Sequence, residues 1–209
     1  MYRSLTASVL FLATTISSAL AQECSGAVQF DDAFETLDPG WGKADEFVKA
    51  SGGKLTVKAE PNLTMLAPNM AFAFTSGEVC TDLTLTNETA DPRAATAGLL
   101  FWYSDKKNFY KASITPAGDL SVSRLLDGKW VTAYPYTASP DVKKGANQAN
   151  SLAVRFEGQS VTVFVNGKEQ TKLKLQPPSG QTFIGAYVGS PEESSDAWDF
   201  TKFRVTAVK

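Results

Sequence analysis

The chain contains no histidine among its 209 residues, and it has two cysteines and three methionines. Without histidine, Ser-His-Asp and Cys-His nucleophile systems and imidazole metal ligands are excluded. Two cysteines alone also supply too few soft ligands for a structural zinc site. The enzyme chemistry that remains open is therefore that of a carboxylate pair.

Long hydrophobic runs are lacking too, and the run at the N-terminus is short. Residues 1–21, MYRSLTASVLFLATTISSALA, place Arg3 ahead of about a dozen apolar residues and end in Ala19-Leu20-Ala21, a pattern typical of a secretory signal peptide. The apolar part is shorter than the roughly 20 residues that span a bilayer, and it contains Thr and Ser. We expect cleavage before Gln22, a secreted or periplasmic location, and no membrane anchor in the mature chain.

An excess of positive charge is also absent. The full chain carries 20 basic and 22 acidic residues; removal of residues 1–21 takes away Arg3 and leaves 19 against 22, a formal charge of −3. This balance offers no basic footprint for nucleic acid or an anionic membrane, so neither is expected as a partner. Residues 22–209 suit one all-β domain with a single core, and we see no linker.

The two cysteines, Cys24 and Cys80, are far apart in the sequence. In an oxidising compartment such a pair is typical of a disulfide rather than of two free thiols. The loop is long enough for the chain-entropy estimate to approach roughly 4 kcal/mol. We expect the bond to tie the N-terminal strand to the sheet.

Helical periodicity is missing after residue 21, where apolar and polar residues alternate with a period of two. This predicts an all-β chain with hairpins at Gly-containing turns. About fourteen short strands are too many for one flat sheet, so we expect a jelly-roll-like sandwich of two antiparallel sheets. The expected strands are 27–34, 46–50, 54–59, 70–74, 78–87, 96–104, 109–115, 120–126, 130–136, 151–157, 160–166, 169–175, 182–189 and 197–208. The expected exposed connections are 88–94, 136–150 and 189–196, the last an acidic loop near the mouth of the sandwich.

The most regular hairpin lies at 151–175, SLAVRFEGQSVTVFVNGKEQTKLKL. Asn166-Gly167 supplies the positive φ values of a type I′ turn. Alternation places one apolar set on a single face, consisting of Leu152, Val154, Phe156, Val161, Val163 and Val165. Arg155, Thr162 and Phe164 then point the other way. We expect this hairpin to be scaffold.

Two segments carry a resemblance to a known superfamily. Residues 97–136, AGLLFWYSDKKNFYKASITPAGDLSVSRLLDGKWVTAYPY, and 150–170, NSLAVRFEGQSVTVFVNGKEQ, resemble bacterial secreted members of the concanavalin A-like lectin/glucanase superfamily. These include domains similar to the 3-keto-disaccharide hydrolase type and laminin-G-like modules. The likeness covers about residues 95–206 and extends more faintly to FDDAFETLDPGW at 30–41. It implies the fold but not the function, because this architecture hosts lectins, glycosidases and adhesion modules alike.

Carboxylates are the next candidates. Glucanases of this superfamily carry an E-x-D-x-x-E or related strand motif, which sets alternate acidic side chains on one concave face as nucleophile and general acid. In this chain no Glu is followed two residues later by Asp, so we name no catalytic residue. Asp32, at the end of the first strand, and Asp199, near the start of the last, could together hold Ca²⁺ through oxygen ligands, as in some relatives. Solvated carboxylates at strand ends are the alternative, because no Asp-rich loop of fixed spacing is present.

Aromatic residues gather between positions 101 and 136, and LLFWY (99–103) is apolar on both faces of its strand. Only one face can serve the sandwich core. With a five-residue turn at 104–108 and a three-residue turn at 116–118, Trp102, Tyr110 and Arg124 fall on the same face. Together with Trp130 they are the candidate ligand-binding residues, since rings beside a guanidinium suit a sugar. The alternative is a satellite core beneath a loop.

Three functions remain open. The first is a secreted or periplasmic non-enzymatic recognition module that binds a glycan, and it predicts a groove with exposed rings and no close carboxylate pair. The second is a glycoside-processing enzyme of the keto-disaccharide hydrolase type, which predicts two convergent acids or a bound metal. The third is a module that binds a cell-surface or extracellular protein through an apolar patch, without a small ligand. Burial of both Trp102 and Tyr110 with no cavity beside them would favour the third.

Overall fold

The computed structural model describes residues 24–208, and its regular elements are strands apart from one short 3₁₀ turn. The elements in chain order are β1 (Val28–Asp32), η1 (Pro39–Trp41), β2 (Val48–Ser51), β3 (Lys54–Ala59), β4 (Thr64–Asn69), β5 (Gly77–Leu85), β6 (Thr96–Asp105), β7 (Asn108–Ile114), β8 (Asp119–Leu126), β9 (Lys129–Ala138), β10 (Asn150–Glu157), β11 (Ser160–Val165), β12 (Lys168–Lys174), β13 (Phe183–Gly189) and β14 (Asp196–Thr206). The predicted all-β class is confirmed. The predicted signal peptide and the cleavage before Gln22 lie outside the described residues and stay predictions.

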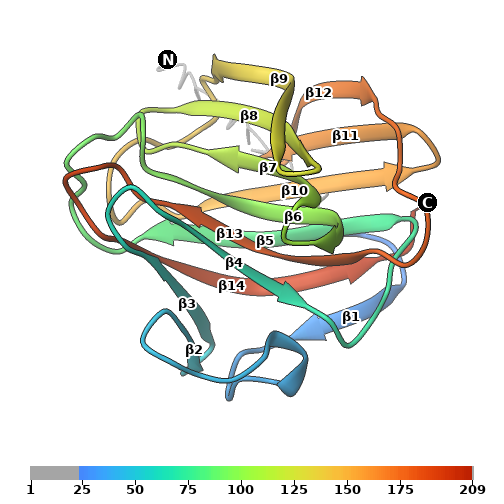
Figure 1. The fold of residues 1–209 in the computed structure, drawn as a ribbon, viewed down its shortest axis with the longest axis horizontal. Coiled ribbons are helices and arrows are strands. Elements are labelled where there is room, and N and C mark those ends of the chain that lie inside the picture. Colours follow the sequence, from blue (N-terminus) through green and yellow to red (C-terminus); the bar gives the residue numbers. More distant parts are fainter. Residues whose placement is uncertain (1–23, 209) are drawn as a thin grey trace, which may run out of the picture.

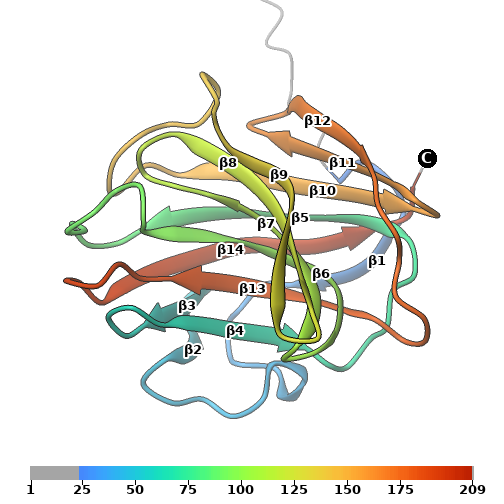
Figure 2. The same cartoon turned by 45° about the horizontal axis from the view of Figure 1, so that its top comes forward.

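The strands form two antiparallel sheets packed face to face, as expected for a jelly-roll sandwich (Figure 1, Figure 2). The larger sheet has the order β12-β11-β10-β5-β14-β3-β2, and β1 also pairs with β14. The smaller sheet has six strands in the order β4-β13-β6-β7-β8-β9. Because β6 to β9 follow one another along the chain, the aromatic segment forms a continuous antiparallel meander within this six-stranded sheet.

The hairpin at 151–175 forms in the predicted register. Val154 pairs with Val163 across β10 and β11, and both are fully buried. Asn166 and Gly167 have φ values of 48° and 79° at the turn into β12, as a type I′ turn requires. Arg155 and Phe164 lie on the outer face, as alternation predicted.

One predicted strand is wrong. The structure places no strand at 70–74, and the preceding segment, Thr64–Asn69, forms β4 instead. β4 lies at the edge of the six-stranded sheet, a position that tolerates Pro68 because one side of the strand needs no ladder hydrogen bonds. Residues 70–74 attach through separate bonds, such as the one from Phe74 N–H to the Thr182 carbonyl.

The predicted disulfide between Cys24 and Cys80 is confirmed, with a Cα–Cα distance of 6.3 Å. It ties the segment before β1 to β5 in the centre of the larger sheet. Disulfides persist in oxidising environments, so the bond supports an extracytoplasmic location. No helix in the described part of the chain is long and apolar enough to cross a membrane.

Reduction of this disulfide, or Cys80→Ser, should lower the free energy of unfolding by about 2 to 5 kcal/mol. The reason is that the bond closes a loop with a sequence separation of 56 residues and so restricts the unfolded chain. Denaturant unfolding with and without reductant measures the difference. Two alkylatable thiols in the non-reduced protein, or an unchanged midpoint, would contradict the expectation.

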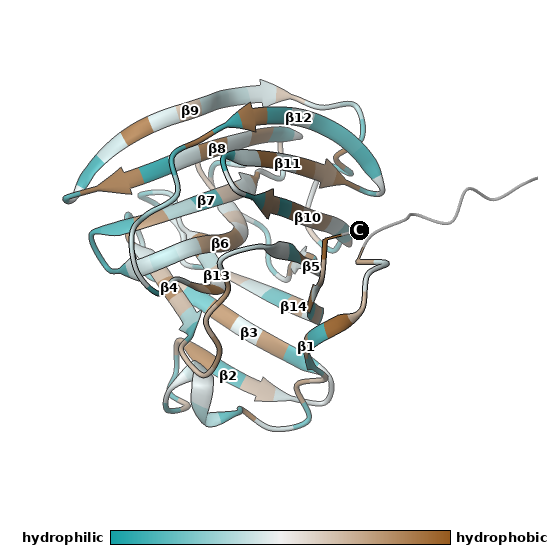
Figure 3. Ribbon diagram, turned by 90° about the vertical axis from the view of Figure 1, so that its right-hand side faces the viewer, coloured by the Kyte–Doolittle hydropathy of each residue, from teal (hydrophilic) through white to brown (hydrophobic). Residues whose placement is uncertain are grey.

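The main core fills the space between the two sheets. A second apolar cluster lies on the outer face of the six-stranded sheet, with Leu100, Tyr103, Phe109 and Tyr187 at its centre. Figure 3 shows how hydrophobic and hydrophilic residues alternate along the strands of both sheets. The six-stranded sheet is thus apolar on both faces over part of its area, as the LLFWY segment indicated.

Candidate functional site

An irregularity in β6 decides where its aromatic rings point. The pairing of β6 with β7 shifts register after Phe101, and the next residue, Trp102, has a φ of +47°. A bulky residue rarely takes a positive φ, and a bulge lets two successive side chains point the same way. Phe101 and Trp102 therefore both belong to the main core, while Leu100 and Tyr103 lie on the outer face.

The predicted contact between Trp102, Tyr110 and Arg124 forms, but on the core side of the sheet. The rings of Trp102 and Tyr110 meet edge-on with centroids 5.4 Å apart, and the guanidinium carbon of Arg124 lies 5.1 Å from the Tyr110 ring centroid. Trp102 is 1% exposed and Tyr110 is 3% exposed. Their polar tips donate to the backbone carbonyls of Thr75 and Gln176. The prediction that these two rings line an open groove is wrong, because the bulge turns the indole into the core.

A small hollow of about 270 Å³ remains beside Tyr110 and Arg124. Its other walls include Asp105 and Ser179, and Trp102 does not line it. Since the Tyr110 ring is almost wholly buried, the hollow presents no open ring face for a sugar to stack on.

Trp130, the fourth predicted residue, lies on the opposite, outer face of the same sheet. It pairs with Leu125 at the start of β9, and its ring meets Phe109 edge-on at 5.7 Å. Trp130 is 51% exposed, whereas the three other tryptophans of the chain are buried. It therefore offers an apolar ring with a polar N–H to a ligand.

Lys111 is the centre of a group next to Trp130. We call the group the lysine cluster, and it consists of Lys111, Ser113, Ser121, Trp130, Tyr136 and Tyr187. The Lys111 Nζ lies 4.1 Å from the ring centroid of Tyr187, 5.4 Å from that of Trp130 and 5.9 Å from that of Tyr136. At these distances an ammonium is attracted to the face of an aromatic ring. The Nζ also donates to Ser113 Oγ at 3.2 Å and to the Tyr136 hydroxyl at 3.5 Å.

The charge of Lys111 has no counter-ion within residues 24–208. Lys111 is 5% exposed, and the ion pairs among the described residues do not include it. On β8, alternation places Asp119 on this face, two residues from Ser121, where it contacts the Thr115 hydroxyl. Burial of an unpaired ammonium costs free energy, which ring faces and two hydroxyls offset in part. The cluster is thus a focus of positive charge beside two half-exposed rings.

Tyr136 responds to this charge. Burial of the phenol raises its pKa, but the Lys111 ammonium and hydrogen bonds with Ser121, Ser113 and Lys111 together outweigh burial and hold the pKa of Tyr136 below its ordinary value. Tyr136 as a whole is 49% exposed. Its hydroxyl, however, lies among Lys111 and the two buried serines, so we take the polar end of the ring as the buried end.

Alkaline titration of phenol absorbance should show that Tyr136 ionises earlier than an ordinary phenol. It should precede Tyr103 and Tyr110, whose pKa values are raised by burial. Tyr136→Phe should remove this first step, and Lys111→Met should move it to higher pH. Because the folded-state pKa of Tyr136 lies below its unfolded value, its ionisation adds stability as the pH rises through that interval. A titration in which no phenol ionises early would contradict the arrangement.

The two carboxylates considered for Ca²⁺ do not converge. Asp32 accepts a hydrogen bond from the Trp41 indole at 2.8 Å. Asp199 accepts from Lys54 Nζ at 2.9 Å and from Thr56 Oγ1 at 2.7 Å. In the part of the chain that the structure describes, no group of three or more His, Cys, Asp or Glu residues is placed to hold a metal ion. The geometry gives both carboxylates structural partners and no shared ligand.

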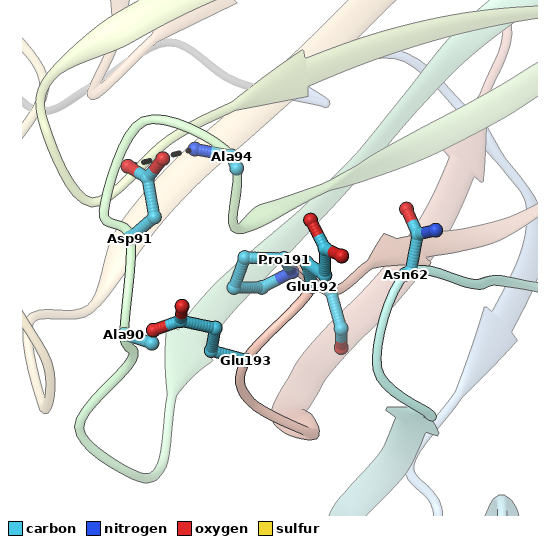
Figure 4. A pocket seen from close by; sticks show the side chains of 8 residues that line it. Asn62, Ala90, Asp91, Ala94, Pro191, Glu192 and Glu193 are labelled. Atoms are coloured by element: carbon cyan, nitrogen blue, oxygen red, sulfur yellow. Dashed lines mark hydrogen bonds between the residues drawn. The ribbon is translucent and has the colours of Figure 1, made fainter.

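A larger hollow, of about 680 Å³, opens at one end of the sandwich (Figure 4). The predicted acidic loop forms one of its walls and connects β13 to β14. The carboxylate of Asp91, on the opposite wall, caps its own loop by accepting from the Arg93 and Ala94 N–H groups. The lining contains no aromatic ring; it consists of Asn62, Ala90, Asp91, Ala94, Ser190, Pro191, Glu192 and Glu193. A sugar would find no stacking surface here.

Lys111, Tyr136 and Tyr187 are not among the site residues predicted from the sequence. A signal for Lys111 exists, because alternation in FYKASI (109–114) puts Lys111 on the face opposite to Tyr110. The lysine thus stands among apolar and small residues, without an acidic neighbour on its strand. No comparable signal marks Tyr187, which reaches the cluster from β13, a strand remote in sequence.

Comparison with known proteins gives matches among solved structures alone. No family model matches the chain, and no curated protein matches it. A carbohydrate-binding module, CBM66 from Bacillus subtilis, covers 82% of this chain and 94% of its own, with 14% identity and a TM-score of 0.56. The Bacillus licheniformis beta-glucanase covers 88% of this chain and all of its own, with 12% identity and a TM-score of 0.59. LamAcat from Zobellia galactanivorans covers 86% and 97%, with 11% identity and a TM-score of 0.61.

The chain has the concanavalin A-like jelly-roll fold. The resemblance seen in the sequence is confirmed at this level. Identities of 11 to 14% establish the fold alone. One of these structures is named a binding module and another a glucanase, so the fold does not decide between recognition and hydrolysis.

Proposed function

We propose that the chain is a non-enzymatic glycan-recognition module that binds sugar on the outer face of the six-stranded sheet. The observation that carries the proposal is that two half-exposed rings, Trp130 and Tyr136, flank the Lys111 ammonium. Such rings combine apolar area with directed polar groups, which is the combination that small polar ligands require. Fold neighbours named as a carbohydrate-binding module and a glucanase support a glycan as the ligand class.

The acidic residues support binding rather than hydrolysis. Glycosidases of the usual kind need two carboxylates that flank the scissile bond, whereas the lysine cluster contains no carboxylate among the described residues. Ser113 accepts a hydrogen bond from Lys111, whereas a serine nucleophile would donate its proton to a general base. Ser113 is also fully buried.

The proposed setting is outside the cytoplasm, secreted or periplasmic. The disulfide between Cys24 and Cys80 supports an oxidising compartment. A glycan ligand would be met there on cell surfaces or in the surrounding medium.

An array of neutral and acidic glycans probed with residues 22–209 tests the proposal. We expect binding to at least one glycan class, with no sugar released from the bound glycan on incubation. Released product would support the hydrolase instead. Failure to bind any glycan would overturn the proposal and favour a protein partner, for which the exposed Leu126, Trp130 and Val131 around the β8–β9 hairpin would be the contact surface.

A further inference from the structure

We propose that this site selects carboxylated sugars, and that Lys111 is the residue that binds the sugar carboxylate. The inference rests on the proposed function, because it names the ligand class of the same face. Its basis is a buried ammonium that lies beside the exposed rings and has no carboxylate partner among the described residues.

A comparison within the molecule shows how this chain treats a purely structural cation beside a ring. Arg155, on the outer face of the larger sheet, lies 5.0 Å from the centroid of Phe164. It also pairs with the buried carboxylate of Glu78 at 2.8 Å. Lys111 is more deeply buried than Arg155, yet it contacts three rings and two hydroxyls and no carboxylate. Arg155 has a carboxylate counter-ion within the protein, whereas Lys111 has none among the described residues. A ligand would supply the counter-ion of Lys111.

The hydrogen bonds of the ammonium leave capacity for such a ligand. A lysine ammonium has three donors. The bond to Ser113 Oγ, at 3.2 Å, is held on the buried side of the cluster, while the contact with the Tyr136 hydroxyl, at 3.5 Å, is at the outer limit of a hydrogen bond. The Tyr136 ring is half exposed, and a carboxylate at this position would replace its hydroxyl as a partner of Lys111. A carboxylate that enters between Trp130 and Tyr136 would then accept a charge-assisted bond from Lys111.

The surroundings favour one anionic group carried on a sugar. The Lys111 ammonium lies over the Trp130 ring, 5.4 Å from the indole centroid, so a sugar held at the exposed part of this ring would lie beside the charge. Among the described residues the lysine cluster itself contains no carboxylate, and the nearby Asp119 of β8 contacts the Thr115 hydroxyl. The chain as a whole has a formal charge of −2, so an anionic glycan finds little attraction elsewhere. Discrimination should therefore come from this single contact.

Paired polysaccharides test the inference. Polygalacturonate, alginate and hyaluronate are each compared with their carboxyl-reduced counterparts, which keep the sugar backbone and lose the charge. The wild-type chain should bind at least one acidic form about tenfold or more tightly than its reduced form, the gain that one charge-assisted hydrogen bond provides. Lys111→Met should abolish this preference, and added salt should weaken it in the wild type alone.

Two further variants sharpen the experiment. Lys174→Met, on an exposed position of β12 in the other sheet, removes the same charge away from the site and should keep the preference. Lys111→Met should fold at least as stably as the wild type, because it replaces an unpaired buried ammonium by an apolar chain of similar length. Lys111→Gln provides a second uncharged variant if the methionine variant is poorly produced.

The outcomes separate the two proposals. Equal affinity for acidic and reduced forms, with binding still lost in Trp130→Ala, would overturn the carboxylate preference and leave glycan binding intact. An acidic preference that survives in Lys111→Met would also overturn the role of Lys111. If the wild type binds neither the acidic forms, nor the reduced forms, nor the neutral glycans of the array, glycan binding itself is overturned.

Discussion

Replacement of Trp102 by alanine should lower the free energy of unfolding by about 3 to 5 kcal/mol, the usual cost of truncating a large core aromatic. The indole is 1% exposed and packs against the rings of Phe101, Tyr110 and Phe156. Alanine would leave a cavity that these neighbours cannot fill, because their own positions are set by the two sheets. Denaturant unfolding measures the loss as a lower midpoint at an unchanged m-value.

The expected effect on binding is small in any Trp102→Ala protein that remains folded, since the ring faces away from the proposed site. A stability loss below about 1 kcal/mol would show that the indole is not the core residue described here. Loss of glycan binding in a Trp102→Ala protein of unchanged stability would show that Trp102 is a ligand-binding residue.

The same substitution at Trp130 should have the opposite consequences. Trp130→Ala should reduce glycan affinity by about thirtyfold or more, the effect of deleting a central aromatic contact worth about 2 kcal/mol or above. Its cost in folding free energy should be about 1 kcal/mol, because half of the ring is exposed and its main contacts are the edge of Phe109 and the Lys111 ammonium. Affinity electrophoresis or calorimetry, alongside denaturant unfolding, measures both quantities on one protein.

Trp130→Phe is the matched control, since it keeps an apolar ring. It should retain part of the affinity that the alanine variant loses. Unchanged glycan affinity in Trp130→Ala would exclude the outer face as the site, and a stability loss as large as that of Trp102→Ala would mark the residue as structural.

Local signals explain the parts of the fold that the sequence predicted well. In the hairpin at 151–175, each strand alternates cleanly and Asn166-Gly167 allows one turn type, so faces and register follow from the residues themselves. The disulfide was predictable because two cysteines in a chain that is predicted to be exported have a single pairing. β4 was not predicted because Pro68 interrupts the strand pattern. The sheet tolerates this proline because β4 is an edge strand, and the edge position is a property of the assembled sheet.

The ligand-binding set was predictable only in part, for a physical reason. LLFWY is apolar at every position, so alternation cannot tell which ring faces the core, and nothing in the residue types marks the positive φ of Trp102. The same difficulty affects β9, whose pairing with β8 shifts register on both sides of Val122. These irregularities bring Tyr134 toward the main core and leave Tyr136 beside Lys111 on the outer face. Bulges are set by the packing of whole sheets, and a short sequence window does not encode them.

Quenching of tryptophan fluorescence by acrylamide, with and without a bound glycan, tests the central claim most directly. Of the four tryptophans, Trp130 is exposed, while Trp41, Trp102 and Trp198 are buried, so the readily quenched fraction of the emission reports on Trp130. If the outer face of the six-stranded sheet is the binding site, a saturating glycan should remove that fraction, and Trp130→Phe should lack it from the start. A glycan that binds while the quenchable fraction stays unchanged would contradict the account and place the site elsewhere on the sandwich.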